Sequence, residues 1–189
     1  AQPDLSSRHF PGFGSVMRSH VGDPNESYLV FRMGHQVEHY ENDQGNIVFY
    51  SKGVPLVLDF GSQYQPMFMR PWLHNRVAFD HRVDGPAGEI SENGFLDAAD
   101  ASLGRVTISR LYEYPEDPKT PTPPNTAAPS KEIKPTTWTR QVMLVKNEQA
   151  TGPTYALVRD GFQGEGDTFT EFTLWCLANG VKTEGGRAE

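Results

Sequence analysis

Residues 45–59 read Gly-Asn-Ile-Val-Phe-Tyr-Ser-Lys-Gly-Val-Pro-Leu-Val-Leu-Asp, and this stretch predicts a β-hairpin. Two runs rich in β-branched and aromatic residues, 45–50 and 54–59, flank the turn signal Lys52-Gly53. Similar runs recur along the chain, at residues 27–32, 76–80, 105–114, 139–146, 155–160 and 168–177. Many short strands bounded by Gly, Asn, Asp or Pro are typical of an antiparallel sandwich or barrel. We therefore predict an all-β fold, and of the two architectures we favour the antiparallel β-sandwich.

The composition is that of a globular domain. The chain has 189 residues, of which 37% are hydrophobic and 22% are charged, so it is long enough to bury a core. No apolar run reaches the roughly 18 residues that a membrane-spanning helix needs. Asp and Glu number 24 against 17 Lys and Arg, which gives a formal net charge of −7. This balance argues against a general nucleic-acid binder, which needs a basic face to neutralise phosphates.

A proline-rich stretch interrupts the strand pattern. Seven of the 21 residues from 115 to 135 are proline, and proline cannot donate to a ladder of backbone hydrogen bonds. The stretch could separate two domains, but the residues on both sides of it have the same strand-like character. We therefore predict one sandwich domain over residues 1–189, as a piece of a larger protein, with 115–137 as a loop within it.

The chain has a single cysteine, Cys176, so an intrachain disulfide is excluded. It lies in the apolar run Phe172-Thr-Leu-Trp-Cys-Leu-Ala178. This setting predicts a buried, unreactive thiol.

Imidazole and carboxylate side chains form one candidate site. His39 and Glu41 are two residues apart, so in an extended chain they point to the same face. Asp59 ends an apolar strand, where a carboxylate needs a partner, and His74 follows in Arg70-Pro-Trp-Leu-His-Asn75. These are the usual ligand types of Zn²⁺ and of non-haem iron. Taken singly, each residue could equally be structural: a hydrogen-bonded histidine, a strand-end carboxylate paired with arginine, or a solvated acid in a turn.

Seven short motifs follow one another in order. They are Phe31-Arg-Met-Gly34, His39-Tyr-Glu-Asn-Asp-Gln-Gly45, Phe49-Tyr-Ser-Lys-Gly53, Leu58-Asp-Phe-Gly61, Tyr64, Arg70 and His74-Asn75. This order resembles the C-terminal β-sandwich domain of the heparinase II/III-like polysaccharide lyases. In that family, Arg-x-Gly precedes His-x-His-x-Asp-x-Gly, and an apolar strand ending in Asp-x-Gly follows. The strands at 140–146 and 155–160 also look like later strands of that domain.

The resemblance implies β-elimination on a uronic-acid-containing polysaccharide. Such an enzyme neutralises the sugar carboxylate, removes the C5 proton with a base and expels the 4-linked oxygen. Matched by position, His39 is implied as the catalytic histidine, and Glu41, Asp59 and His74 as ligands of a divalent metal, zinc first. The residues expected to bind substrate are Arg70, Tyr64, Trp72 and Asn75. The resemblance also implies a secreted or periplasmic location.

Two departures from the family pattern matter. Glu41 replaces the second histidine of the motif, so a hard, anionic oxygen ligand stands where the family has an imidazole nitrogen. Such a ligand set also suits Mn²⁺ or Ca²⁺, and loss of the metal is a further alternative. The family's lyases also carry an N-terminal α/α toroid that supplies further catalytic residues, and nothing before Phe10 could encode it. We therefore expect an acidic polysaccharide as ligand, and a toroid domain or a partner chain to complete the cleft.

Two other functions stay open. A sandwich of this kind can be a non-catalytic module for glycan binding or protein interaction, which would bind glycan without forming an unsaturated product. His39, Glu41 and His74 also match the two-histidine, one-carboxylate triad of Fe(II) oxygenases. That reading predicts bound iron and oxygen consumption, but it leaves Asp59 without a role.

Overall fold

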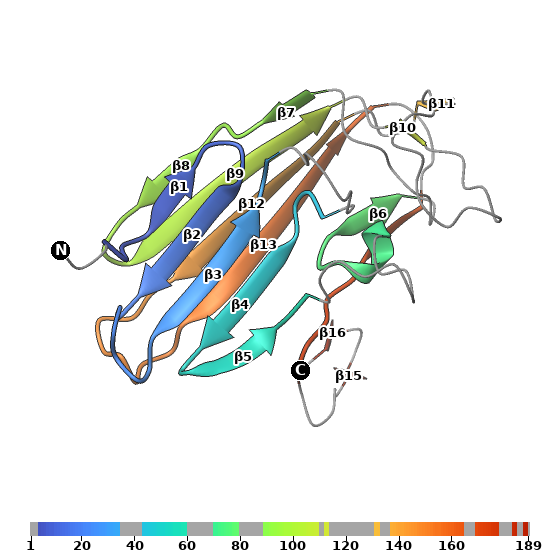
Figure 1. Cartoon of the computed structure of the whole chain (residues 1–189). Helices are drawn as coiled ribbons and strands as arrows, with labels where there is room; N and C mark the ends of the chain where they lie inside the picture. Colours follow the sequence, from blue (N-terminus) through green and yellow to red (C-terminus); the bar gives the residue numbers. More distant parts are fainter. Residues whose placement is uncertain are drawn as a thin grey trace.

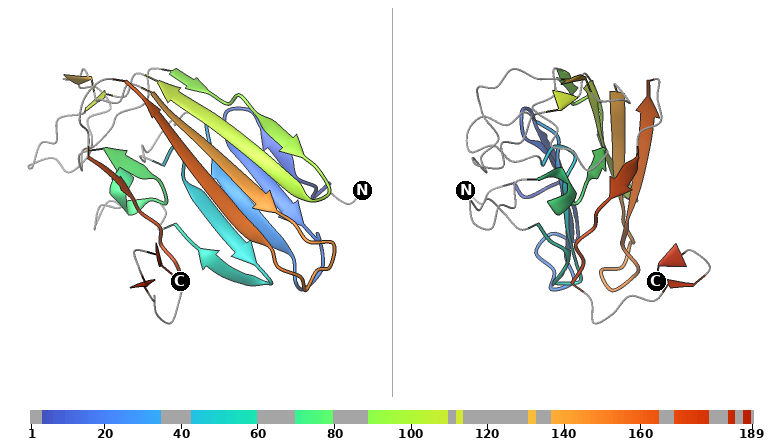
Figure 2. Two further views of the ribbon diagram at one scale, coloured as in Figure 1. Left: turned by 180° about the vertical axis from the view of Figure 1, so that it is seen from behind. Right: turned by 90° about the vertical axis from the view of Figure 1, so that its right-hand side faces the viewer.

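Two antiparallel sheets lie face to face and form a sandwich (Figures 1 and 2). The computed structural model describes residues 4–34, 43–59, 70–79, 89–109, 112–113, 131–132, 137–164, 169–177, 183–184 and 187–188. Within these residues there is no α-helix, and no helical segment is long and apolar enough to cross a membrane. The predicted all-β sandwich is confirmed.

The first sheet has the order β1-β2-β3-β4-β5. Its strands are β1 (Arg8–Phe10), β2 (Gly14–Ser19), β3 (Ser27–Arg32), β4 (Ile47–Ser51) and β5 (Val54–Val57). Each strand pairs with the next along the chain, so this sheet is a simple meander. The predicted hairpin is therefore β4 and β5, and Lys52 and Gly53 both have positive φ angles, 56° and 74°. Such a two-residue turn matches the twist of the strands it joins.

The second sheet has the order β13-β12-β9-β7, and β8 also pairs with β9. Its strands are β7 (Glu89–Ser91), β8 (Phe95–Asp97), β9 (Ala101–Ser109), β12 (Thr137–Val145) and β13 (Tyr155–Gln163). Strands β9 and β12 pair with each other along nine residues. The proline-rich stretch therefore connects two neighbouring strands of one sheet. At its base, β10 (Tyr112–Glu113) pairs with β11 (Lys131–Glu132), and residues 114–130 and 133–136 lie outside the described part.

The core lies between the two sheets and follows from the alternation of side chains along each strand. In β9 and β12 every second residue is buried. The largest buried apolar side chains from the two sheets are Met17, Leu29, Phe31, Met33, Ile108, Trp138 and Leu144. Gly104 faces this core, and a Cβ atom there would lie 2.6 Å from Met33 Cε and 2.9 Å from Phe31 Cδ1. The missing side chain lets the sheets approach closely at their centre.

A late segment of the chain, residues 169–177, closes the open edge of the first sheet beyond β5. Its strand β14 (Thr170–Phe172) pairs with β6 (Val77–Phe79), which follows the 3₁₀ turn η1 (Pro71–Leu73). The segment then runs beside β5: Leu58 N donates to Trp175 O at 3.2 Å, and Leu177 N donates to Leu56 O at 3.0 Å. Figure 1 shows this red segment passing β6 on its way to β5. We call residues 169–177 the strap.

The strap overturns one prediction. Cys176 was expected to be buried, but it is exposed. The strap is attached through its backbone to the edge of a sheet, and Phe172, Leu174 and Leu177 are exposed as well. An apolar run therefore does not bury its side chains here. The last short strands, β15 (Thr183–Glu184) and β16 (Arg187–Ala188), pair with each other.

Candidate functional site

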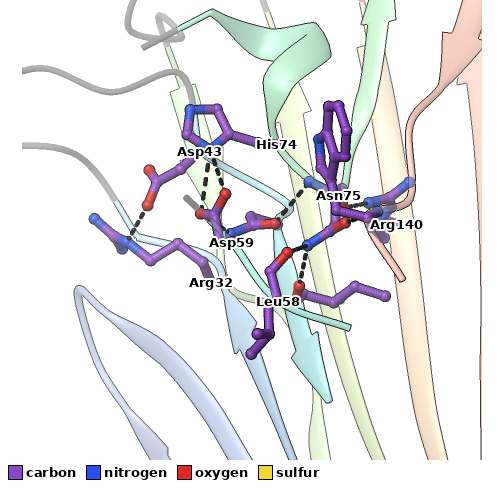
Figure 3. Close-up of polar contacts among 10 residues, drawn as sticks. Arg32, Asp43, Leu58, Asp59, His74, Asn75 and Arg140 are labelled. Atoms are coloured by element: carbon purple, nitrogen blue, oxygen red, sulfur yellow. Dashed lines mark hydrogen bonds and ion pairs between the residues drawn. The ribbon is translucent and has the colours of Figure 1, made fainter. Parts of the chain in front are cut away.

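Asp59 and His74, two of the three predicted metal ligands, lie against each other. Asp59 follows the end of β5, and His74 follows η1, so the chain returns to the end of the strand it has just left. Nδ1 of His74 lies 2.9 Å from Oδ1 and 3.1 Å from Oδ2 of Asp59. The His74 side chain is completely buried and that of Asp59 is 16% exposed. Figure 3 shows the imidazole directly above the carboxylate.

The second ring nitrogen of His74 has no such partner. Nε2 is buried, and it makes no hydrogen bond with the part of the chain that the structure describes. Buried polar atoms are nearly always paired, so an unpaired one calls for an explanation such as a bound ion. With Nδ1–H donating to Asp59, Nε2 carries a lone pair. A metal at Nε2 would lie on the far side of the ring from Asp59, which would then only orient the histidine, whereas a metal shared with Asp59 would replace the proton on Nδ1.

Two buried asparagines, Asn46 and Asn75, connect the segment of Asp59 with the segment of His74 through hydrogen bonds. Asn46 Nδ2 donates to Asp59 Oδ2 at 2.6 Å, and Asn46 Oδ1 accepts from Asn75 N at 2.9 Å. Asn75 Nδ2 donates to Ile47 O at 2.9 Å and to Leu58 O at 3.0 Å, and its Oδ1 accepts from Trp175 N at 2.6 Å. Asn75 therefore joins β4, β5 and the strap. Its side chain is wholly buried, so the predicted contact with substrate has no support in this structure.

A buried arginine of the second sheet, Arg140, donates hydrogen bonds to the main chain at and next to these asparagines. Arg140 donates to Gly45 O at 2.7 Å and to Asn75 O at 2.9 Å. It also makes two hydrogen bonds to Asp160, of 2.7 and 2.9 Å, and Trp138 Nε1 donates to the same carboxylate at 2.8 Å. Burial lowers the pKa of Arg140, and the bonds to Asp160 oppose that change. Bidentate pairing to a carboxylate is what makes a buried guanidinium tolerable.

Arg70 and Trp72, predicted to bind substrate, also lie together. The guanidinium of Arg70 is 5.4 Å from the centre of the Trp72 ring, in a cation–π contact. Both residues are half-buried and belong to the turn that leads into His74. The structure thus brings five predicted residues into one region: Asp59, Arg70, Trp72, His74 and Asn75. The binding of substrate by Arg70 and Trp72 stays a prediction.

The geometry of the sandwich can be compared with known proteins. A solved structure described as a heparinase III gene product with methylated lysines matches 97% of this chain, with a TM-score of 0.65 and 14% sequence identity. This chain has the fold of a heparinase III domain. It covers 26% of that solved chain, about a quarter of its length. No family model matches the sequence, and no curated protein matches it. The likeness to heparinase III confirms the resemblance at the level of the fold.

Three predicted residues lie outside the described part of the chain: His39, Glu41 and Tyr64. Within the described part there is no group of three His, Cys, Asp or Glu side chains that could hold a metal. The pair of Asp59 and His74 supplies two such donors. The contact between them also gives Asp59 a role, which the oxygenase reading leaves it without.

Two residues of the site, Asn46 and Arg140, were not predicted from the sequence. Arg140 could have been found from the alternation in β12, which places it on the same face as Trp138 and Val142. Asn46 gives no such signal, because its partners are 13 and 29 residues away along the chain. Nearby, Arg32 lies 3.4 Å from Asp43 in an ion pair (Figure 3).

Proposed function

We propose that this chain is the β-sandwich part of a secreted or periplasmic lyase that cleaves uronic-acid-containing polysaccharide by β-elimination. One observation carries the proposal. The buried pair of Asp59 and His74, with Nδ1 of His74 2.9 Å from Oδ1 of Asp59, stands at the positions where the order of motifs implies metal ligands. The likeness of the fold to part of heparinase III supports the choice of family.

A divalent metal would be held by the Asp59 carboxylate and by Nδ1 of His74, where it would take the place of the ring proton, with Glu41 as the third protein ligand. Zinc suits one imidazole and carboxylate oxygens, whereas a second carboxylate at position 41 also suits Mn²⁺ or Ca²⁺. When bound, the ion would link the end of β5 to the segment before β6, and its binding energy would add to folding stability.

The chemistry of elimination would fall to other side chains. His39 would face the cleft as an acid–base group, and Arg70 would neutralise the sugar carboxylate, which a guanidinium can pair with in two hydrogen bonds. Trp72 offers an aromatic ring against a sugar face. Because the chain covers 26% of the heparinase III chain, a toroid domain or a partner chain would supply the rest of the cleft.

The first test is the metal content of the purified chain, measured by elemental mass spectrometry. We expect about one zinc, manganese or calcium ion per chain, lost in His74→Ala. The control is His9→Ala, because His9 is partly buried and pairs with Glu92 elsewhere in the sandwich. Iron together with oxygen consumption would favour the oxygenase instead. If the purified chain contains no metal even after preparation in zinc-containing buffer, the proposal of a metal site is contradicted.

The second test is the ultraviolet absorbance of unsaturated products, using alginate, ulvan and heparan-type polysaccharides. Product formation that is lost in His39→Ala would support a lyase. Saturable binding of a polysaccharide without any product, even when a toroid-bearing partner is supplied, would favour a glycan-binding module.

A further inference from the structure

We infer that Asn46 is the positioning residue of the metal site, because it fixes the Asp59 carboxylate relative to the segment that carries His74. The inference rests on the proposed function, since it concerns the same metal. It goes beyond the predicted ligand set, in which Asn46 has no part.

Both ends of the Asn46 amide are occupied. Its Nδ2 donates to Asp59 Oδ2 at 2.6 Å, the shorter of its two bonds, and its Oδ1 accepts from Asn75 N at 2.9 Å. A flipped amide would place oxygen against the carboxylate and NH₂ against the Asn75 N–H, so only one orientation satisfies both partners. The amide is therefore a fixed bridge.

The backbone of Asn46 is held as firmly as its side chain. Its N–H donates to Asp43 O at 2.9 Å, and its carbonyl accepts from Arg32 N at 2.9 Å. The residue as a whole is 5% exposed. An anchored backbone and a singly oriented amide leave Asn46 little freedom to follow Asp59 if the carboxylate moves.

The hydrogen bonds form a closed ring that begins and ends on adjacent residues. Asn75 N–H donates to Asn46, Asn46 donates to Asp59, and Asp59 accepts from Nδ1 of His74, the residue that precedes Asn75 in the chain. Figure 3 labels three members of this ring: Asp59, His74 and Asn75. The position of Asp59 is thus set with reference to His74 rather than by the end of β5 alone.

A ligand that is already ordered loses less freedom when the metal binds. Outer partners of metal ligands accordingly contribute about 10–100-fold to metal affinity. Without Asn46, the Asp59 side chain could rotate away from His74, and the metal would have to restore its orientation. The expected effect of losing Asn46 is on metal affinity, with both proposed ligands still present.

The test is Zn²⁺ affinity, measured by competition with a chromophoric chelator, for the full chain and its variants. Asn46→Ala should bind Zn²⁺ about 10–100-fold more weakly. Asn46→Ser should do the same while disturbing the fold less, because its hydroxyl is too short to reach both partners. The control is Ser27→Ala, which removes a buried bond of 2.9 Å to Ser51 at the other end of the same sheet. It should stay within about twofold of the parent affinity.

The outcomes separate the inference from the proposed function. Parent-like Zn²⁺ affinity in both Asn46 variants, with Asp59→Ala and His74→Ala still losing the ion, would overturn the role of Asn46 alone. A parent chain that binds no Zn²⁺ would overturn the metal site and the role of Asn46 together. The absorption spectrum of bound Co²⁺, altered in the Asn46 variants but not in Ser27→Ala, would support a changed ligand geometry.

Discussion

Replacing Arg140 with methionine should destabilise the sandwich by about 3–5 kcal/mol, the usual cost of removing one partner of a buried ion pair. Arg140 is fully buried and donates two hydrogen bonds to Asp160 and two to main-chain oxygens, those of Gly45 and Asn75. Methionine fills most of the space but donates nothing. Asp160, 17% exposed, would keep only the indole N–H of Trp138 among the partners the structure describes.

The size of the effect follows from what is left behind. A buried polar group that loses its partner costs about 1–3 kcal/mol, and a charged one costs more. Asp160 and two carbonyl oxygens all lose donors in this variant. Since domains of this size are stable by about 5–15 kcal/mol, the variant would lose a large share of its stability. With a urea m-value of about 2 kcal/mol/M, the unfolding midpoint should fall by about 1.5–2.5 M.

Urea unfolding followed by tryptophan fluorescence measures this directly, because Trp138 packs against Arg140 in the core. The control is Arg159→Met on the neighbouring strand, whose exposed side chain makes one bond of 3.3 Å to Gln141. It should change the free energy of unfolding by about 0.5 kcal/mol or less. Adding Asp160→Leu to Arg140→Met should recover part of the loss, because it removes the stranded charge. A loss below about 1 kcal/mol in Arg140→Met would refute the reasoning.

Three further predictions concern the core and one surface carboxylate. Leu144→Ala should lower the free energy of unfolding in urea by about 2–5 kcal/mol, because Leu144 is fully buried. The control Leu157→Ala, at an exposed position of the neighbouring strand, should lower it by about 0.5 kcal/mol or less. Equal losses in the two variants would contradict the assigned faces of the sheet. Gly104→Ala should cost about 1–3 kcal/mol by overpacking the closest approach of the two sheets, and an unchanged midpoint would show that the methionines there move aside freely. Burial alone would raise the pKa of Asp97, but hydrogen bonds from Lys146, Ser102 and Ser7 outweigh it and lower the pKa. The stability that the Asp97 carboxylate contributes is therefore present above pH 3.8, its ordinary value, and lost as the pH falls through the lowered one. The advantage of the parent chain over Asp97→Asn in thermal unfolding should accordingly shrink on acidification, and an advantage that grew would reverse the sign of the argument.

The strands that the sequence predicts best are those with a long alternating pattern and a clear turn. Residues 27–32 match β3 at both ends, and the hairpin of β4 and β5 turns at Lys52-Gly53. Two of the strands that were not predicted, β7 and β8, have three residues each and are held by their pairing with β9. Their structure comes from a partner strand, which a local pattern does not reveal.

The residues of the candidate site likewise fall into those that the sequence predicts and those that only the structure reveals. The order of motifs led to Asp59 and His74, and the structure brings these two together. Which residues hold them in place depends on contacts between distant parts of the chain, as with Asn46. The prediction that Cys176 is buried was wrong, because the strap pairs through its backbone and leaves its apolar side chains exposed. Hydrophobicity alone does not distinguish an edge segment from a core strand.

The strap also sets the time at which the site can be completed during synthesis. The bond from Trp175 N to Asn75 Oδ1 joins residues 100 positions apart. At a translation rate of about 5–20 residues per second, the strap emerges about 5–20 s after Asn75. Until then β5 is an unprotected edge, which is a template for pairing with other nascent chains. The candidate metal ligands Asp59 and His74 are thus made before the strap, and the framework around them can be completed only after the strap has emerged.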